Sequence, residues 1–286
     1  MSSIAATPLS RRQATLALVA APFAPSLAAA GSLASRPAAA RAQLTIVLTG
    51  GMSSQETFDP KPAAPLAHRS PAGLIATSIP GVHFSAWLPR LAARAHDFTL
   101  VRTVTLGDAP ATHPAGMALL PAATVTSPAP TASSPRSIAY GTSRFGSLCR
   151  TAVERLAAGS TAECVHFAET VYDTLSWDMH ANGAGLPVTL ADYRDTLCPQ
   201  LDRVLTALFD DLQQRDLWHR ADVRVVTEVG RSPRFNARGG RDHALAPFCV
   251  LLAGSRFEGG QILGKTSPDG GEIQSNPILL PDLLAL

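Results

Sequence analysis

The sequence contains few charged residues and little excess charge of either sign. Asp, Glu, Lys and Arg make up 16% of its 286 residues, and the formal net charge is +2. The first 42 residues hold 4 arginines and no acidic residue, so without them the net charge is +2 − 4 = −2. Nucleic-acid-binding proteins usually carry a clustered basic surface. We therefore expect no nucleic-acid partner.

Cysteine is also scarce, and no two cysteines are spaced as Cys-x-x-Cys, which makes a zinc ribbon improbable. Outside the cytosol the cysteines could form disulfides, but sequence alone does not give their pairing. Buried free thiols are an equally good interpretation. The residues concerned are Cys149, Cys164, Cys198 and Cys249.

No segment has the roughly 20 consecutive apolar residues that a transmembrane helix needs. The N-terminal apolar run Ala14–Ala24 is shorter; it follows Arg11-Arg12 and precedes the small-residue sites Ala28–Ala30 and Ala40–Ala42. This order is typical of a cleavable twin-arginine signal, although a disordered alanine-rich leader with a chance arginine pair would look similar. We expect residues 1–42 to direct export through the twin-arginine machinery and then to be removed. The mature protein would be periplasmic or secreted, with no stable membrane anchor.

Four apolar runs alternate with helical patterns in the remaining 244 residues, 43–286. This alternation predicts one α/β domain with a doubly wound, largely parallel sheet and helices on both faces. Ligands in such folds lie at the carboxyl ends of the strands. The predicted strands are Gln43–Thr49, Phe98–Thr105, Asp222–Val229 and Pro247–Ala253, and the predicted helices are Ser85–His96, Arg144–Ala158 and Leu190–Asp216.

Two local signals refine the prediction of the longest helix. A separate segment shows neither a strand pattern nor a helical pattern. Thr189 followed by Asp192 is a plausible N-terminal cap, and Pro199 is expected to kink the helix or divide it. Residues 121–136 are rich in Pro, Ala, Ser and Thr without periodicity, so we expect a low-complexity loop or linker there.

Metal-binding side chains are concentrated in the second half of the sequence. Asp178 and His180 are two residues apart, so in an extended segment they would point the same way and could bind one ion. The other proposed ligands are Glu228, Asp242 and His243, of which Asp242 could instead orient a ligand. Mixed imidazole and carboxylate donors favour Zn or Mn over Mg or Ca.

Each of these residues also has an ordinary interpretation. A single Asp-x-His is more often a hydrogen-bonded loop pair, and Arg231 could simply form an ion pair with Glu228. The grouping favours a divalent metal site instead. Arginine forks suit sulfate and phosphate oxyanions, and Arg231, Arg234 and Arg241 flank the acidic and histidine donors. A metal beside arginine indicates ester hydrolysis, with Arg231 as a catalytic candidate.

Motifs along nearly the whole mature sequence resemble those of the domain of unknown function 1501 family. They include TGGMSSQETFDPKP at Thr49–Pro62, YGTSRFGSLC at Tyr140–Cys149, SWDMHANG from Ser176, TEVGRSPRFN from Thr227 and GGRDH at Gly239–His243. This family is related to the alkaline phosphatase and sulfatase superfamily, so the resemblance implies an alkaline phosphatase-like α/β fold with a two-metal-type site. It implies Asp178, His180, Glu228 and His243 as ligands.

The resemblance also bears on residues that the local pattern leaves open. Glu56 stands where relatives usually have an aspartate ligand. Ala111–Pro121 resembles the sulfatase nucleophile segment, which would make Thr112 the nucleophile, with His113 as the alternative functional residue. The segment between His113 and Tyr140 is shorter than in relatives, and the sequence ends within what resembles the final helix. We therefore expect a trimmed fold, in which any lost strand would leave sheet edges and apolar faces exposed.

Two functional hypotheses follow. In the first, the protein is a metal-dependent hydrolase of small-molecule or glycan sulfate or phosphate esters. In the second, it is a degenerate, non-catalytic relative that binds an anionic glycan or a protein partner. The retained ligand residues favour the first, and the altered nucleophile segment favours the second.

Overall fold

A computed structural model describes residues 42–128, 135–181 and 186–286. Apart from Ala42, the predicted signal peptide lies outside the described residues, as do residues 129–134 of the predicted low-complexity loop. Within the described part of the chain, no helix combines the length and the apolar character needed to cross a membrane.

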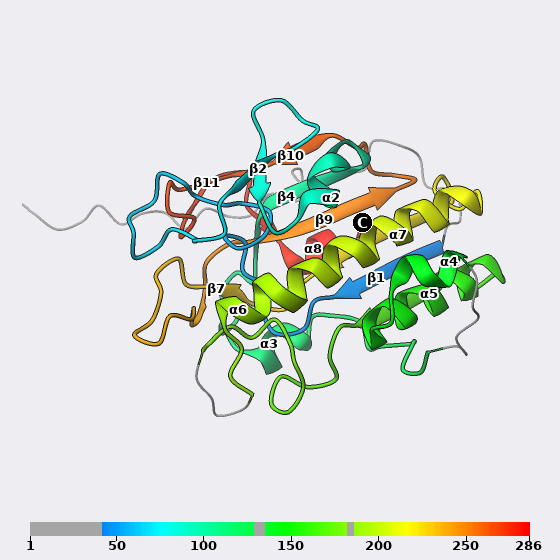
Figure 1. The fold of residues 1–286 in the computed structure, drawn as a ribbon, viewed down its shortest axis with the longest axis horizontal. Coiled ribbons are helices and arrows are strands. Elements are labelled where there is room, and N and C mark those ends of the chain that lie inside the picture. Colours follow the sequence, from blue (N-terminus) through cyan, green and yellow to red (C-terminus); the bar gives the residue numbers. More distant parts are fainter. Residues whose placement is uncertain (1–41, 129–134, 182–185) are drawn as a thin grey trace, which may run out of the picture.

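Long apolar runs form the central strands of a mixed sheet (Figure 1). Strand β1 is parallel to β5 and β6, and β4 is parallel to β10 and β13, whereas β9 is antiparallel to β4 and β6. The largely parallel α/β sheet is therefore confirmed, with β9 as the exception. In spatial order the strands are β10 (Gln261–Leu263), β4 (Phe98–Thr105), β9 (Phe248–Gly254), β6 (Ala221–Val226), β1 (Ala42–Val47) and β5 (Ala162–His166), and β13 (Ile278–Leu279) also pairs with β4.

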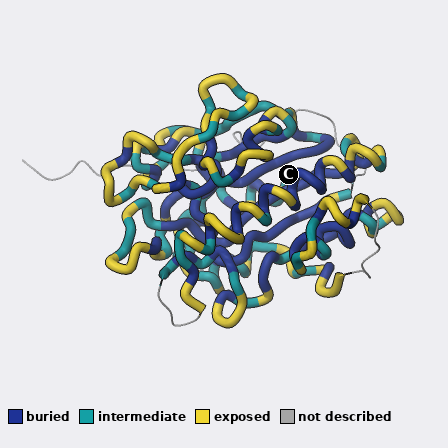
Figure 2. The backbone as a smooth tube through the Cα atoms, viewed as in Figure 1, coloured by how far each residue is buried: buried dark blue, intermediate teal, exposed yellow. Residues whose placement is uncertain are grey.

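Helices cover both faces of this sheet, as predicted. Alternate residues of β1 belong to two different core clusters: Leu44 and Ile46 to one, Val47 to the other. Figure 2 shows the strands as the buried centre between exposed loops. The first face carries α2 (Pro89–Ala93), α4 (Pro135–Tyr140), α5 (Arg144–Ala157) and α7 (Cys198–Gln214); the second carries α3 (His113–Met117) and α8 (Leu280–Leu284).

The longest helical region is continuous, but its pitch changes just before Pro199, where we expected a kink or a division. It begins as α6 (Leu190–Asp192) with the predicted cap, in which Thr189 and Asp192 form a capping box. A π-helical turn, η2 (Tyr193–Leu197), then leads into α7. Because Pro199 has no N–H and its ring crowds the preceding turn, a wider turn just before it relieves the conflict.

The predicted helix Ser85–His96 is wrong over most of its length. The chain instead forms β3 (His83–Ser85), the short α2 and the 3-10 turn η1 (Ala95–Asp97). Pro89 explains the difference, since a proline disfavours helical geometry in the residue before it and starts a helix well. Strand β6 also ends at Val226, earlier than predicted.

The edge strand β5 is covered, contrary to the expectation of an open edge. The amides of Thr124 and Val125 donate to the carbonyl of Cys164 at 3.0 and 3.1 Å, and the Cys164 amide donates to the Thr124 hydroxyl at 2.8 Å. The segment before the low-complexity loop therefore caps part of this edge. The remaining strands form three two-stranded pairs: β2 (Leu74–Ala76) with β3, β7 (Gly230–Arg231) with β8 (His243–Ala244), and β11 (Lys265–Thr266) with β12 (Ile273–Ser275).

Candidate metal centre

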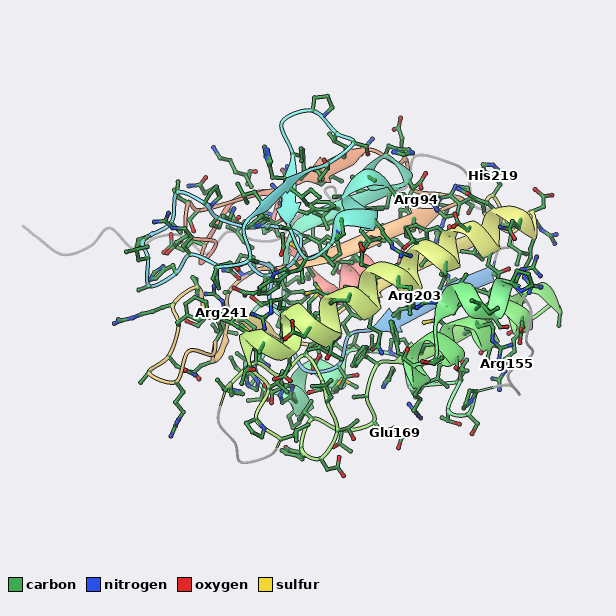
Figure 3. The ribbon with its side chains drawn as sticks, in the orientation of Figure 1. Arg94, Arg155, Glu169, Arg203, His219 and Arg241 are labelled. Carbon is green, nitrogen blue, oxygen red and sulfur yellow. The ribbon has the colours of Figure 1, made fainter. Side chains whose placement is uncertain are left out.

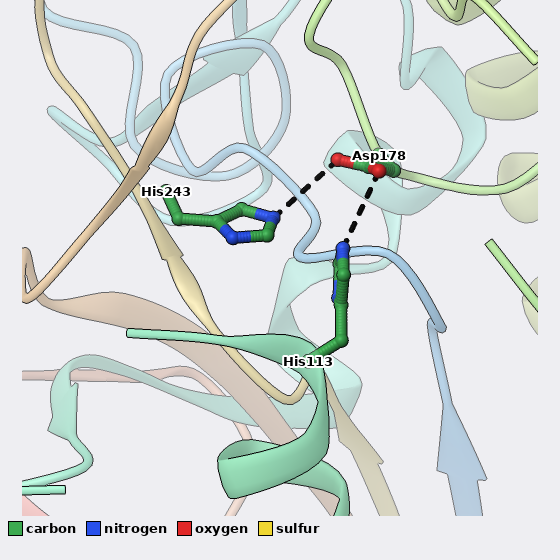
Figure 4. Close-up of side chains that lie close together, drawn as sticks. All are labelled: His113, Asp178 and His243. Atoms are coloured by element: carbon green, nitrogen blue, oxygen red, sulfur yellow. Dashed lines mark ion pairs between the residues drawn. The ribbon is translucent and has the colours of Figure 1, made fainter. Parts of the chain in front are cut away.

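Three side chains of the kinds that can bind a metal lie close together (Figure 4). His113 is the first residue of α3, Asp178 lies in the loop after β5, and His243 is in β8. One candidate ligand atom from each lies within 4.8 Å of the other two. Nε2 of His113 is 3.3 Å from Oδ2 of Asp178, and Nε2 of His243 is 3.5 Å from Oδ1. Residues far apart in the sequence therefore form a single cluster.

Glycines allow the segments that carry these residues to approach closely. Gly50 follows β1 with φ of 116°, and a Cβ atom on it would lie 2.4 Å from the amide nitrogen of Asp178. Gly116 in α3 packs against Glu228, where an added Cβ would lie 1.8 Å from the carbonyl oxygen. Any larger residue at either position would push a ligand-bearing segment away.

Glu228 orients His113 instead of joining the cluster directly. Its Oε1 lies 2.7 Å from Nδ1 of His113 and accepts a bond from the amide of Gly50 at 2.6 Å, while Oε2 accepts from Gly51 at 3.2 Å. The carboxylate is fully buried. A carboxylate bound to one imidazole nitrogen fixes the direction of the other. Nε2 of His113 is thereby turned towards Asp178.

The carboxylates dominate the protonation of the cluster. Burial opposes a charged imidazole, but Asp178 and Glu228 outweigh it and raise the pKa of His113 from 6.5 to about 9. Burial likewise opposes ionisation of Asp178, yet His113, His243 and Arg231 hold its pKa far below the usual range. Burial also opposes ionisation of Glu228, but the bond to His113 lowers its pKa. Burial lowers the pKa of His243, which favours the neutral, metal-binding form.

Two nitrogens of the cluster have no hydrogen-bond partner among the residues that the structure describes. Nε2 of His113 and Nε2 of His243 are buried; both lie within ion-pair distance of Asp178 but outside hydrogen-bond geometry. Buried polar atoms are almost always satisfied. A divalent cation between these nitrogens and the Asp178 carboxylate would satisfy all three groups. Two imidazoles and a carboxylate are also the donor set that Zn and Mn accept.

His180 and Asp242 lie beside the cluster, towards solvent. Nε2 of His180 is 3.2 Å from Oδ1 of Asp178, and its Nδ1 is 3.1 Å from Oδ1 of Asp242. The His180 and His243 rings are 4.6 Å apart. Asp242 is 58% exposed and also accepts from Asn236, so it orients His180 in the structure.

Arg231 is buried behind the cluster and is not exposed to a substrate. Its guanidinium donates to the carbonyls of Gly50, Gly51 and Arg241 and to Oδ1 of Asp178. Its side chain has 0% exposure. Every nitrogen of the guanidinium is therefore engaged, and the expected role of gripping substrate oxygens does not fit this arrangement.

The structure does not bring Glu56 to the cluster. Both its carboxylate oxygens accept from the guanidinium of Arg241 at 2.8 Å, and Ser53 also donates to one of them. Thr112, the expected nucleophile, is exposed next to His113. Its hydroxyl is the N-cap of α3 and accepts from the amide of Ala115 at 3.4 Å. Thr112 therefore lies next to the site because it precedes His113 in the chain.

His113 is the one ligand candidate that the sequence pattern did not assign to the metal. No Asp-x-His or similar spacing marks it. A weaker signal is that His113 follows β4. Strand β9 is antiparallel to both β4 and β6, so β4 runs in the same direction as β6 and β1. The position of His113 beyond the carboxyl end of β4 places it at the edge of the sheet where ligands bind.

A comparison with protein families matches residues 40–153 and 139–286 to the family described as "Protein of unknown function (DUF1501)". The chain belongs to the DUF1501 family. The family assignment expected from the motifs is thereby confirmed. No curated protein has a sequence that matches this DUF1501 chain.

Several solved structures are similar to this DUF1501 chain at low identity. Ps i-CgsB in complex with k-i-k-neocarrahexaose is 10% identical, with a TM-score of 0.41 over 86% of this chain and 70% of that one. The PsFucS1 sulfatase from Pseudoalteromonas sp. is 9% identical, with a TM-score of 0.39 over 85% and 68%. A protein in the alkaline phosphatase superfamily from Vibrio parahaemolyticus is 12% identical, with a TM-score of 0.33 over 82% and 65%.

Proposed function

We propose that this protein is a metal-dependent hydrolase of sulfate or phosphate esters that works in the periplasm or outside the cell. His113, Asp178 and His243 hold the cation, and His180 is the fourth donor because its Nε2 lies 3.2 Å from Asp178. Zn or Mn suits these donors best. The precursor would leave the cell folded, through the twin-arginine machinery, and the substrate is a small-molecule or glycan ester.

The observation that carries this proposal is the pair of buried Nε2 atoms on His113 and His243 without a hydrogen-bond partner, both facing one carboxylate. In a purely structural cluster these two nitrogens have only the ion-pair contacts with Asp178 and no well-formed hydrogen bond, which is unfavourable for buried polar atoms. A bound cation removes that cost. The cation would also lie between the negatively charged Asp178 carboxylate and the two imidazole rings.

When bound, a divalent cation supplies Lewis-acid polarisation of the ester oxygens and stabilises the charge that develops on them. The protein's own residues hold the ligands in position: Arg231 donates a hydrogen bond to Asp178, and Glu228 is hydrogen-bonded to His113. A water molecule or the Thr112 hydroxyl attacks sulfur or phosphorus and gives up its proton, the bond from sulfur or phosphorus to the ester oxygen breaks, and the departing alcohol takes up that proton. If Thr112 is the nucleophile, water then hydrolyses the sulfated or phosphorylated threonine and regenerates the hydroxyl.

The engagement of Arg231 favours the second candidate, a non-catalytic protein that binds an anionic glycan or a protein partner. All its guanidinium nitrogens are bonded within the protein, so it cannot hold the spectator oxygens of a transition state. Under this alternative the cation would be structural.

Turnover measurements separate the two candidates. The purified full chain, after elemental analysis, is assayed on 4-nitrophenyl sulfate and 4-nitrophenyl phosphate with and without a chelator. Asp178→Ala should lose both the metal and the turnover. The matched control is Asp173→Ala, because Asp173 is an exposed aspartate of the same loop and bonds only to Thr170 and Thr174. Metal content without turnover in the wild type would reject the hydrolase and leave the binding protein.

A further inference from the structure

A buried ion pair holds the hairpin that carries His243. This hairpin, defined here as residues 230–244, consists of β7, β8 and the residues between them. Arg241 donates from Nε to Oε2 and from Nη2 to Oε1 of Glu56, both at 2.8 Å. Both side chains have 0% exposure. Figure 3 labels Arg241 near the end of the molecule where β1 finishes and α6 begins.

The guanidinium of Arg241 also fixes the path of the hairpin. It donates to the carbonyls of Ser232 and Pro233 within the hairpin, and to the carbonyl of His68 at 2.9 Å in the segment after β1. It lies 3.8 Å from the centroid of the Phe235 ring. The Arg241 amide donates to the carbonyl of Met179, next to Asp178. Arg241 thus joins three segments of the site, one through its backbone amide and the other two through a planar fork that lysine cannot reproduce.

We infer that Glu56 and Arg241 are positioning residues for His243, and that the cluster holds a single cation. The inference depends on the proposed function only in taking His113, Asp178 and His243 as the ligands. His243 follows Arg241 by two residues, so the position of the guanidinium determines where β8 begins. Breaking a buried ion pair from one side leaves an uncompensated charge, so the pair resists displacement by a metal.

Within the described part of the chain, no second group of three donors is arranged to hold another ion. Glu56 would have to give up Arg241 to bind one, and Glu228 would have to give up His113 and the amides of Gly50 and Gly51. Among the described residues, His113, Asp178 and His243 form the one group of three suitable donors. The two-metal-type site that the family resemblance implies therefore does not fit these contacts.

Metal stoichiometry tests the single-cation part directly. The metal-free full chain is titrated with Zn²⁺ alone and analysed for zinc after gel filtration. We expect one tightly bound ion per chain. Two tightly bound ions would overturn the inference, and so would the absence of any bound zinc.

Paired variants test the positioning role. Glu56→Gln and Arg241→Lys should each weaken zinc binding roughly 10- to 100-fold, as loss of a partner that orients a ligand usually does. In the double variant Glu56→Gln/Arg241→Lys the losses should not add, because both changes break one interaction. The matched control is Asp222→Asn, which breaks the buried pair with Arg256 at the other end of β6 and should lower Tm without changing zinc affinity.

The outcomes distinguish a ligand from a positioning residue. If Glu56→Gln loses zinc while Arg241→Lys, folded by circular dichroism, binds it as the wild type does, Glu56 is a ligand and the inference is wrong. If Asp222→Asn weakens zinc binding as much as the other variants do, the effect is general destabilisation, which also overturns it. These readouts measure zinc and not ester turnover, so an inactive protein with one zinc ion would refute the proposed function alone.

Discussion

His113 and Glu228, which are 115 positions apart in the sequence, form a hydrogen-bonded pair of 2.7 Å between Nδ1 and Oε1. This contact gives the imidazole a fixed tautomer when neutral, with Nε2 free for a metal. The carboxylate is in turn held by the amides that follow β1. The end of one strand therefore determines the orientation of a ligand on a helix that follows another strand.

Glu228→Gln should weaken zinc binding by roughly 10- to 100-fold, because the neutral amide orients and polarises His113 less strongly. Isothermal titration of the metal-free protein with Zn²⁺ measures the effect, and circular dichroism confirms the fold. Glu258→Gln is the matched control, since Glu258 is exposed and bonds through its side chain only to Gln261. Wild-type affinity in a folded Glu228→Gln variant would refute the orienting role.

The metal-free protein should lose stability in alkaline solution through His113. Its pKa in the folded protein is raised from 6.5 to about 9, with burial opposing and Asp178 and Glu228 favouring the charge. A raised folded pKa gives a contribution to stability that is fully present below 6.5 and disappears as the pH rises through about 9. Chemical denaturation between pH 6 and pH 10 tests this. His113→Gln should remove that pH dependence, and an equal loss of stability in this variant would contradict the assignment.

The sequence was a good guide where burial alone decides the structure. Strand β9 is an uninterrupted apolar run and β1 and β4 are rich in apolar and β-branched residues, and the sequence predicts all three within two residues. Strand β5 was missed because AECVH contains Glu163, whose polarity argues against a buried strand. That carboxylate is compensated in its buried position by the Thr124 hydroxyl, which donates to it at 2.7 Å, and by Arg155 at 3.5 Å. Because Thr124 is 39 residues away from Glu163, a local sequence pattern does not reveal this partner.

The same limit explains the outcome at the site. Asp178 and His243 were predicted as donors from short motifs, and the structure brings them together with His113. Whether Glu56 meets a metal or an arginine depends on Arg241, which is 185 positions away. Local sequence shows which residues can bind a cation. Which of these residues are instead paired with another side chain is determined only by how the loops pack.

Gly116→Ala should destabilise the protein by about 1–3 kcal/mol or more, because the new methyl group would overlap the backbone of Glu228. Backbone atoms cannot move aside as a side chain can, so α3 would shift and carry His113 with it. Thermal unfolding and zinc affinity should both fall. In the control Gly271→Ala the added carbon would lie 3.0 Å from a Pro233 side-chain atom, and we expect a smaller effect. Equal effects in both variants would argue against the close packing at Gly116.

The four cysteines should be free and unreactive in the folded protein. None is paired, and their exposures are between 0% and 3%. Burial raises the pKa of Cys164 and of Cys249 to about 12, which suppresses the reactive thiolate. Ellman's reagent should therefore react with no thiol before unfolding and with all four afterwards. Fewer reactive thiols after unfolding without a reductant would reveal a disulfide and contradict this prediction.

Thr124→Val should weaken the cover over the edge of β5. The change keeps the shape of the side chain but removes the hydroxyl that accepts from the Cys164 amide and donates to Glu163. Leaving these groups unsatisfied should cost about 1–3 kcal/mol and expose strand edge to other chains. Denaturant unfolding measures the first effect and light scattering at high concentration the second. Thr126→Val is the control, because Thr126 is exposed like Thr124, but its hydrogen bond among the described residues comes from its carbonyl, which accepts from Arg144. If the two variants unfold and aggregate alike, the segment before residue 129 does not protect this edge.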